Sequence, residues 1–156
     1  MSDNIDCCFR EGNSWFRYRA AAVIIADGYA LFADNGEYYY SVGGGVHIGE
    51  SSAEAVLREI TEETGLAAEI ERPLCLAENF FSGDGALEGV DCHTIELYYL
   101  LKPTREAMIS TENAAEKLRW LPIDRLNEYD IRPSLLKQLA ANPPESFLLI
   151  NNKERK

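Results

Sequence analysis

The sequence predicts an α/β protein, and more specifically an α/β/α sandwich around a mixed central β-sheet. Segments with the pattern of strands outnumber segments with helical spacing, and the two kinds are interspersed along the chain. The sequence has no internal repeat, low-complexity tract or long linker. Its 156 residues, 46% of them hydrophobic, are enough for one core, so residues 1–156 are expected to form a single domain.

Strand signals dominate the first part of the chain. Residues 16–26, FRYRAAAVIIA, are typical of a long strand that is buried toward its end, and the N-terminus before them suits a loose leader or an edge strand. Asp27-Gly28 is a strong hairpin turn signal. Residues 29–34 are therefore expected to form a second strand, and residues 37–42 a third.

One helix is predicted between Ser51 and Gly65. Ser51 is suited to cap the first turn, and Glu54 can reach back to its N–H, which is a capping box. Gly65 supplies the left-handed residue that ends a helix. Residues at helical spacing are expected to face the core, and they are Ala53, Val56, Leu57, Ile60 and Thr64.

The remainder of the chain returns mostly to strands. We expect one or two strands in residues 67–81, a glycine-rich acidic loop in residues 82–91 and another strand in residues 92–102. A second acidic region follows, with Glu112 and Glu116.

The C-terminal part alternates short elements. Residues 117–121 suit a short strand, and a helix is expected to start near Asp124. Another helix is predicted over residues 135–141, because the proline pair after it stops a helix. Residues 147–150 have the composition of an added edge strand.

Three carboxylates gather on one side of the predicted central helix. Glu59, Glu62 and Glu63 lie at positions i, i+3 and i+4, flanking the apolar stripe. Like charges at this spacing destabilise a helix, and the helix dipole disfavours them in its C-terminal half. A bound divalent cation explains the arrangement, because Mg²⁺ takes carboxylate oxygens and bridges to substrate phosphates. The alternative is a solvated acidic helix face.

A glycine triplet comes just before this helix and after a predicted strand. Gly43, Gly44 and Gly45 are expected to form a loop, since glycines permit close approach of the main chain to a ligand. A strand, a glycine loop and a helix together commonly present backbone groups to phosphates.

The stretch from Gly44 to Leu66 resembles the signature of the Nudix hydrolase family, GX5EX7REUXEEXGU, in which U is a bulky aliphatic residue. Glu50 follows Gly44 after five residues, and Arg58 follows after seven more. The rest of the stretch is Glu59-Ile60-Thr61-Glu62-Glu63-Thr64-Gly65-Leu66, so every specified position matches. The order of strands and helices on both sides also suits the family.

The resemblance implies a Nudix-type fold and hydrolysis of a pyrophosphate bond in a nucleoside diphosphate-linked substrate, with Mg²⁺ or Mn²⁺ as cofactor. It implies that the metal ligands are Glu59, Glu62, Glu63 and the backbone carbonyl of Gly43. It also implies that the catalytic residues are Glu62, Glu63, Arg58 and Glu50, with Arg58 holding a glutamate by a salt bridge. A carboxylate near the metal then accepts the proton of the attacking water. Which carboxylate does so stays open at this point.

Candidate substrate contacts lie both inside and outside this signature. Arg17 and Arg19 alternate along their strand and should share a face, where they either are solvated or hold a phosphate or base. Phe80 is a candidate for stacking on a nucleobase, and core packing is the alternative. Gly44 and Gly45 are expected to approach the substrate.

The loop of residues 82–91 is a candidate for a lid or for the source of a catalytic carboxylate, with Glu88 the candidate residue. The alternative, which we favour slightly, is an exposed hairpin connection.

Charge and cysteine content limit the partners. The net charge of −11 and a pI near 4.6 argue against nucleic acid and against an anionic membrane surface as partners. The small nucleotide substrate that the resemblance implies is also an anion, so a metal ion or local arginines must overcome the unfavourable field. The four cysteines lack CxxC spacing, and no secretory signal or spanning apolar run is visible, so a cytoplasmic location with reduced thiols is expected.

Three questions stay open in the sequence. The substrate candidates are a nucleoside triphosphate, ADP-ribose, a sugar nucleotide and a dinucleoside polyphosphate. Whether the chain forms a homodimer is also open. A nucleotide sensor that binds without hydrolysis is the alternative function, although all the signature glutamates are present. RNA cap removal is disfavoured by the absence of a basic patch.

Overall fold

The computed structural model describes residues 4–104 and 117–153. Its elements in chain order are β1 (Cys8–Glu11), β2 (Ser14–Ala26), β3 (Tyr29–Asp34), β4 (Tyr39–Tyr40), β5 (Val42–Gly45), α1 (Ser52–Thr64), β6 (Ala68–Ser82), the 3₁₀ helix η1 (Gly85–Leu87), β7 (Asp91–Pro103), β8 (Leu118–Pro122), the 3₁₀ helix η3 (Ile123–Glu128), α2 (Leu135–Ala141) and β9 (Leu148–Lys153). The region with Glu112 and Glu116 lies outside the described residues.

Strand β2 organises the sheet. One of its edges pairs antiparallel with β1, then β5, then β3 as the strand proceeds. Its other edge pairs in parallel with β7 from Ser14 to Ile24. Strand β6 pairs antiparallel with β7 and in parallel with β9, so β9 lies at the end of the strand order β4-β3-β2-β7-β6-β9. The sheet is therefore mixed, as predicted.

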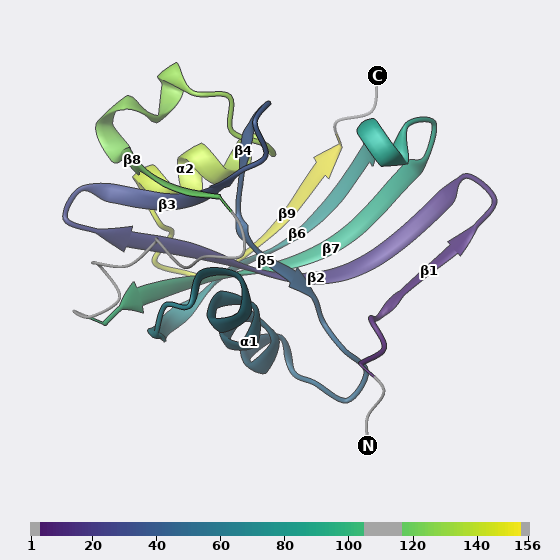
Figure 1. Cartoon of the computed structure of the whole chain (residues 1–156), viewed down its shortest axis with the longest axis horizontal. Helices are drawn as coiled ribbons and strands as arrows, with labels where there is room; N and C mark the ends of the chain where they lie inside the picture. Colours follow the sequence, from purple (N-terminus) through teal and green to yellow (C-terminus); the bar gives the residue numbers. More distant parts are fainter. Residues whose placement is uncertain (1–3, 105–116, 154–156) are drawn as a thin grey trace.

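Helices cover both faces of this sheet (Figure 1). Ala20, Ala22 and Ile24 of β2 pack in one hydrophobic cluster with Val56 and Ile60 of α1. The alternate residues of β2, among them Ala21 and Val23, pack in a second cluster with Leu136 and Leu139 of α2. Successive side chains of a strand point to opposite faces, so an apolar run along β2 supplies both cores. The predicted α/β/α sandwich is confirmed.

The predicted third strand is divided at Ser41. Strand β4 pairs with β3, whereas β5 pairs with β2, so the chain changes its partner strand between them. The carbonyl oxygen of Ser41 accepts a hydrogen bond from the Arg19 side chain, 2.8 Å away, instead of continuing a ladder. This division starts β5 directly before the glycines.

The other predicted elements agree with the structure, with one difference in detail: the segment at Asp124 is a 3₁₀ helix with a non-helical residue, Arg125. The 67–81 region, expected to form one or two strands, forms one strand with register shifts. The Asp27-Gly28 hairpin, the 135–141 helix and the C-terminal edge strand are all present.

All four cysteines are free thiols. Within the described ranges, no helix combines the length and apolarity needed to cross a membrane.

Candidate active site

Helix α1 begins and ends where its local signals predict. The Ser51 hydroxyl accepts from the Glu54 N–H at 3.2 Å, and the Glu54 carboxylate accepts from the Ser51 N–H at 2.8 Å. Gly65 ends the helix in the left-handed conformation, with φ of 69°. This capping box fixes where the helix begins, and the contact of Arg58 with the Gly45 carbonyl holds it against β5.

The buried face of α1 differs from the predicted one. Ala55 and Glu59 are buried, whereas Leu57 is exposed and Ala53 is half-buried. The prediction that all three glutamates flank the apolar stripe is therefore wrong for Glu59. Its carboxylate is accommodated because Gly44 of β5 has no side chain at that position, and a Cβ there would overlap the Glu59 carboxyl group.

The prediction of a glycine loop is also wrong, because the triplet lies within strand β5. Gly43, Gly44 and Gly45 pair in register with Ala21, Ala20 and Arg19 of β2. A Cβ at Gly43 would overlap the β2 backbone, and one at Gly45 would lie 2.7 Å from a carboxylate oxygen of Asp6. The glycines thus let a strand pack closely against acidic side chains.

Arg58 is the centre of an ion-pair group that we call the Arg58 cluster, comprising Arg58, Glu50, Glu59 and Glu62. Its Nε donates to Glu50 at 2.7 Å, and its Nη1 donates to Glu59 at 2.8 Å and to Glu62 at 3.3 Å. Its Nη2 donates to Glu50 and to the Gly45 carbonyl, each at 3.0 Å. One guanidinium therefore ties three carboxylates to β5.

These contacts shift the ionisation of the group. The Arg58 hydrogen bond is the largest cause lowering the pKa of Glu50 to about 2, and the His47 backbone N–H adds to it. The same pairing raises the pKa of Arg58, with Glu50 the largest cause. Glu50 is consequently an anion throughout the neutral range.

Glu62 is the exposed member of the Arg58 cluster, and Glu63 lies beside it and contacts β5. The Glu62 side chain is 59% exposed, and a Glu63 oxygen accepts from the Gly43 N–H at 3.4 Å. In the described part of the chain, no three His, Cys, Asp or Glu side chains are gathered as a metal-binding cluster. The donors are nevertheless carboxylate and backbone oxygens at neighbouring positions, the ligand type that suits Mg²⁺ or Mn²⁺.

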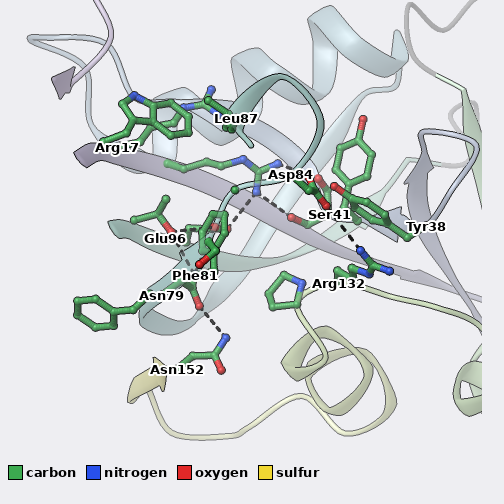
Figure 2. A pocket seen from close by; sticks show the side chains of 18 of the residues that line it. Arg17, Tyr38, Ser41, Asn79, Phe81, Asp84, Leu87, Glu96, Arg132 and Asn152 are labelled. Atoms are coloured by element: carbon green, nitrogen blue, oxygen red, sulfur yellow. Dashed lines mark hydrogen bonds and ion pairs between the residues drawn. The ribbon is translucent and has the colours of Figure 1, made fainter. Parts of the chain in front are cut away.

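A pocket of about 780 Å³ is lined by residues of β2, β6 and β7 and of the loops beside them (Figure 2). Its aromatic lining residues are Trp15, Tyr38, Tyr40, Phe80 and Phe81. Its charged and amide lining residues are Arg17, Arg19, Arg132, Asp84, Glu96, Asn35, Asn79 and Asn152. The volume and the mixture of aromatic and polar walls are typical of a small-molecule site.

A buried group of hydrogen bonds forms one wall of the pocket, and we call it the Glu96 network: Arg19, Asn79, Thr94, Glu96 and Tyr98. Glu96 accepts from Arg19 at 3.0 Å and from the Tyr98 hydroxyl at 2.9 Å. Burial is the largest single influence on Arg19 and opposes its charge, but Glu96, Tyr98 and Glu63 together outweigh burial, so the pKa of Arg19 is raised. Burial, and next Glu96, raises the pKa of Tyr98.

The pocket and the acidic helix are adjacent through β5. Arg19 pairs in register with Gly45, and its side chain also donates to Ser41, directly before β5. Glu63 is among the charges that raise the pKa of Arg19. Arg19 and the segment from Ser41 to Gly45 therefore connect the wall of the pocket to α1.

The family model for the NUDIX domain matches residues 16–141. The chain belongs to this family. The resemblance found in Gly44–Leu66 is confirmed, and the match covers the Arg58 cluster and most of the pocket. No curated protein matches the chain.

Several solved structures have the same fold. A UDP-X diphosphatase superposes with a TM-score of 0.61 at 21% identity, covering 85% of this chain and 66% of that chain. An ADP-ribose pyrophosphatase from Streptococcus suis has a TM-score of 0.60 at 14% identity, covering 87% and 98%. A MutT NUDIX hydrolase from Burkholderia pseudomallei has a TM-score of 0.51 at 27% identity, covering 70% and 84%.

Some of the residues predicted to contact the substrate line the pocket, and others do not. Arg17 and Phe80 line the pocket, with the Arg17 guanidinium 5.8 Å from the centre of the Trp15 ring. Arg19 also lines it, but its hydrogen bonds go to Glu96 and Ser41, so it is neither solvated nor free for phosphate. Glu88 is exposed and is not a lining residue.

The loop of residues 82–91 contributes the carboxylate of Asp84 to the pocket, whereas the predicted carboxylate is that of Glu88. Asp84 and Leu87 of residues 82–91 line the pocket, and the segment connects the antiparallel strands β6 and β7. The favoured interpretation as a hairpin connection is confirmed.

Sequence reasoning missed Glu96, Tyr38, Arg132 and Asn152. Glu96 lies mid-strand among apolar residues, where a charged residue between buried neighbours is itself a signal. Arg132 lies 4.4 Å over the Tyr38 ring, a contact between distant segments that has no local signature.

Proposed function

We propose that this Nudix hydrolase cleaves the pyrophosphate bond of a nucleoside diphosphate-linked substrate with Mg²⁺ or Mn²⁺ as cofactor. The supporting observation is the adjacency of an aromatic, arginine-lined pocket to the carboxylates of α1 across β5. Aromatic faces suit a nucleobase, and carboxylate oxygens suit the cation that accompanies a diphosphate.

The ion would be held by Glu59, Glu62, Glu63 and the carbonyl of Gly43. When bound, such an ion neutralises phosphate charge and lowers the pKa of the attacking water. The chain's own contribution is positional: Arg58 holds Glu50 and Glu59 in fixed orientations, and its contact with the Gly45 carbonyl ties both to β5. A carboxylate of this group accepts the proton of the water.

The solved relatives support a substrate of this class. A UDP-X diphosphatase and an ADP-ribose pyrophosphatase share the fold, and both names describe a nucleoside diphosphate joined to another group. The pocket provides room for such a nucleoside, and Arg17 provides positive charge at its wall.

The test is a hydrolysis screen of the purified full chain. Nucleoside triphosphates, ADP-ribose, sugar nucleotides and dinucleoside polyphosphates are each incubated with Mg²⁺, with Mn²⁺ and with chelator. We expect one class to be cleaved far faster than the rest and only with metal. Ligand-induced thermal stabilisation without turnover of any compound would instead identify a nucleotide sensor.

A further inference from the structure

Asn152 of β9 is a pocket residue that the proposed chemistry does not use. It is half-buried, and its side-chain Nδ2 donates to Oδ1 of Asn79 at 2.9 Å. Strand β9 lies after the end of the family match at residue 141. Figure 2 shows Asn79 between Glu96 and Asn152 on one side of the pocket.

The orientation of Asn79 follows from the acid behind it. Glu96, paired with Arg19, is a carboxylate and only accepts hydrogen bonds. The Thr94 hydroxyl donates to Glu96 at 3.3 Å, so it offers only an acceptor to Asn79. The Asn79 Nδ2 faces both of these acceptors, at 3.3 Å from Glu96 and 3.4 Å from Thr94.

The orientation of the Asn79 amide in turn determines the orientation of the Asn152 amide. Because the Asn79 nitrogen faces inward, its Oδ1 faces Asn152 and requires a donor there. The Asn152 amide is therefore held with its nitrogen toward Asn79, and its carbonyl oxygen and second N–H remain for other partners. A carboxamide held in one orientation distinguishes bases by the donors and acceptors on their edges.

We propose that Asn152 is a specificity-determining residue that reads the hydrogen-bonding edge of the substrate's nucleobase. This rests on the proposed function for the presence of a nucleoside in the pocket. The aromatic walls hold any base, since every base has a stacking face, whereas the oriented amide discriminates between them. Asn79, Thr94 and Glu96 are positioning residues that set the orientation.

The test measures equilibrium binding of AMP, GMP, CMP and UMP to the full chain by calorimetry, with hydrolysis recorded separately. We expect the wild type to bind one monophosphate about tenfold or more tighter than the weakest, the size of discrimination by one good amide pair. Asn152→Ala should bring the four affinities close together while leaving the weakest one unchanged.

The matched control is Asn151→Ala, the same change at the adjacent, exposed residue of β9. It should keep the wild-type preference and melting temperature, whereas Asn152→Ala should stay folded with a somewhat lower melting temperature, because it leaves the buried Asn79 oxygen without its donor. Asn152→Asp should also lose the preference, because an acceptor then faces the Asn79 oxygen.

Four results would overturn the proposal: no binding of any monophosphate, equal binding of all four by the wild type, an unchanged preference in Asn152→Ala, or equal weakening of all four in that variant. A base preference that depends on Asn152 in a chain that hydrolyses nothing would reject only the proposed hydrolysis. Hydrolysis with no base preference would reject only the role of Asn152.

Discussion

The Arg58 cluster and the Glu96 network are both built around one arginine, yet they differ in burial. Glu62 of the Arg58 cluster is mostly exposed, while Asn79, Thr94 and Glu96 of the Glu96 network are each less than 10% exposed. An exposed charge is hydrated when its partner is removed, whereas a buried charge is left without compensation. The exposed carboxylate of Glu62 can therefore be lost at little cost to the fold, whereas the buried carboxylate of Glu96 cannot.

The largest effect is expected from Glu96→Ala. The substitution leaves the Arg19 guanidinium buried without its carboxylate, which costs about 3–5 kcal/mol of stability. Urea unfolding of the variant measures this loss. The apolar double replacement Arg19→Met with Glu96→Leu is the control and should recover much of the stability, because no buried charge then remains. A single variant as stable as the wild type would show that the two regions do not differ.

The double substitution Glu62→Gln with Glu63→Gln tests the other side of the contrast. We expect turnover to fall by about a hundredfold, or about 2.7 kcal/mol of transition-state stabilisation, with an unchanged melting temperature. The steady-state rate on the substrate found in the screen measures it. Glu69→Gln with Glu71→Gln, the same change in charge at two exposed residues of β6, should be active. A fully active, folded Glu62/Glu63 variant would remove the proposed metal site from α1.

A smaller effect is expected in the pH dependence of folding stability. The folded-state pKa of Glu50 is about 2, below its ordinary value of 4.5, so its ionised form stabilises the fold. This contribution is complete above about pH 4.5 and is lost as the pH falls through 2. The urea midpoint of the wild type should therefore fall more steeply than that of Glu50→Gln between pH 5 and 2. Parallel curves would mean that Arg58 does not hold Glu50 in solution.

The smallest effect is expected for Glu88→Gln. Because the side chain is exposed and lies outside the pocket lining, turnover and KM should stay within about twofold of the wild type. Steady-state kinetics on the same substrate provide the measurement. A clear loss of turnover would show that the Glu88 carboxylate takes part in the reaction.

The elements of the fold were predictable where the signals are local. The capping box at Ser51, the stop at Gly65 and the Asp27-Gly28 turn each depend on residues a few positions apart, and all three are present. The family signature is likewise one contiguous stretch, so its acidic residues could be named before any contact was known.

The features that sequence analysis missed depend on distant segments. Arg19 and Glu96 are 77 positions apart, and Asn79 and Asn152 are 73 apart, so each pair exists only because β2, β6, β7 and β9 adopt a particular register. The burial of Glu59 similarly depends on Gly44 and Arg58 acting together. Neither helical spacing nor strand alternation contains that information.

The position of β9 has a consequence for how this enzyme type diversifies. The strand pairs with β6 at the end of the strand order, contributes one amide to the pocket and lies beyond the segment that the family model matches. Substitutions there alter one wall of the pocket and leave α1 and β5 untouched. Substrate preference can therefore change during evolution through substitutions in β9, while the residues of α1 and β5 stay the same.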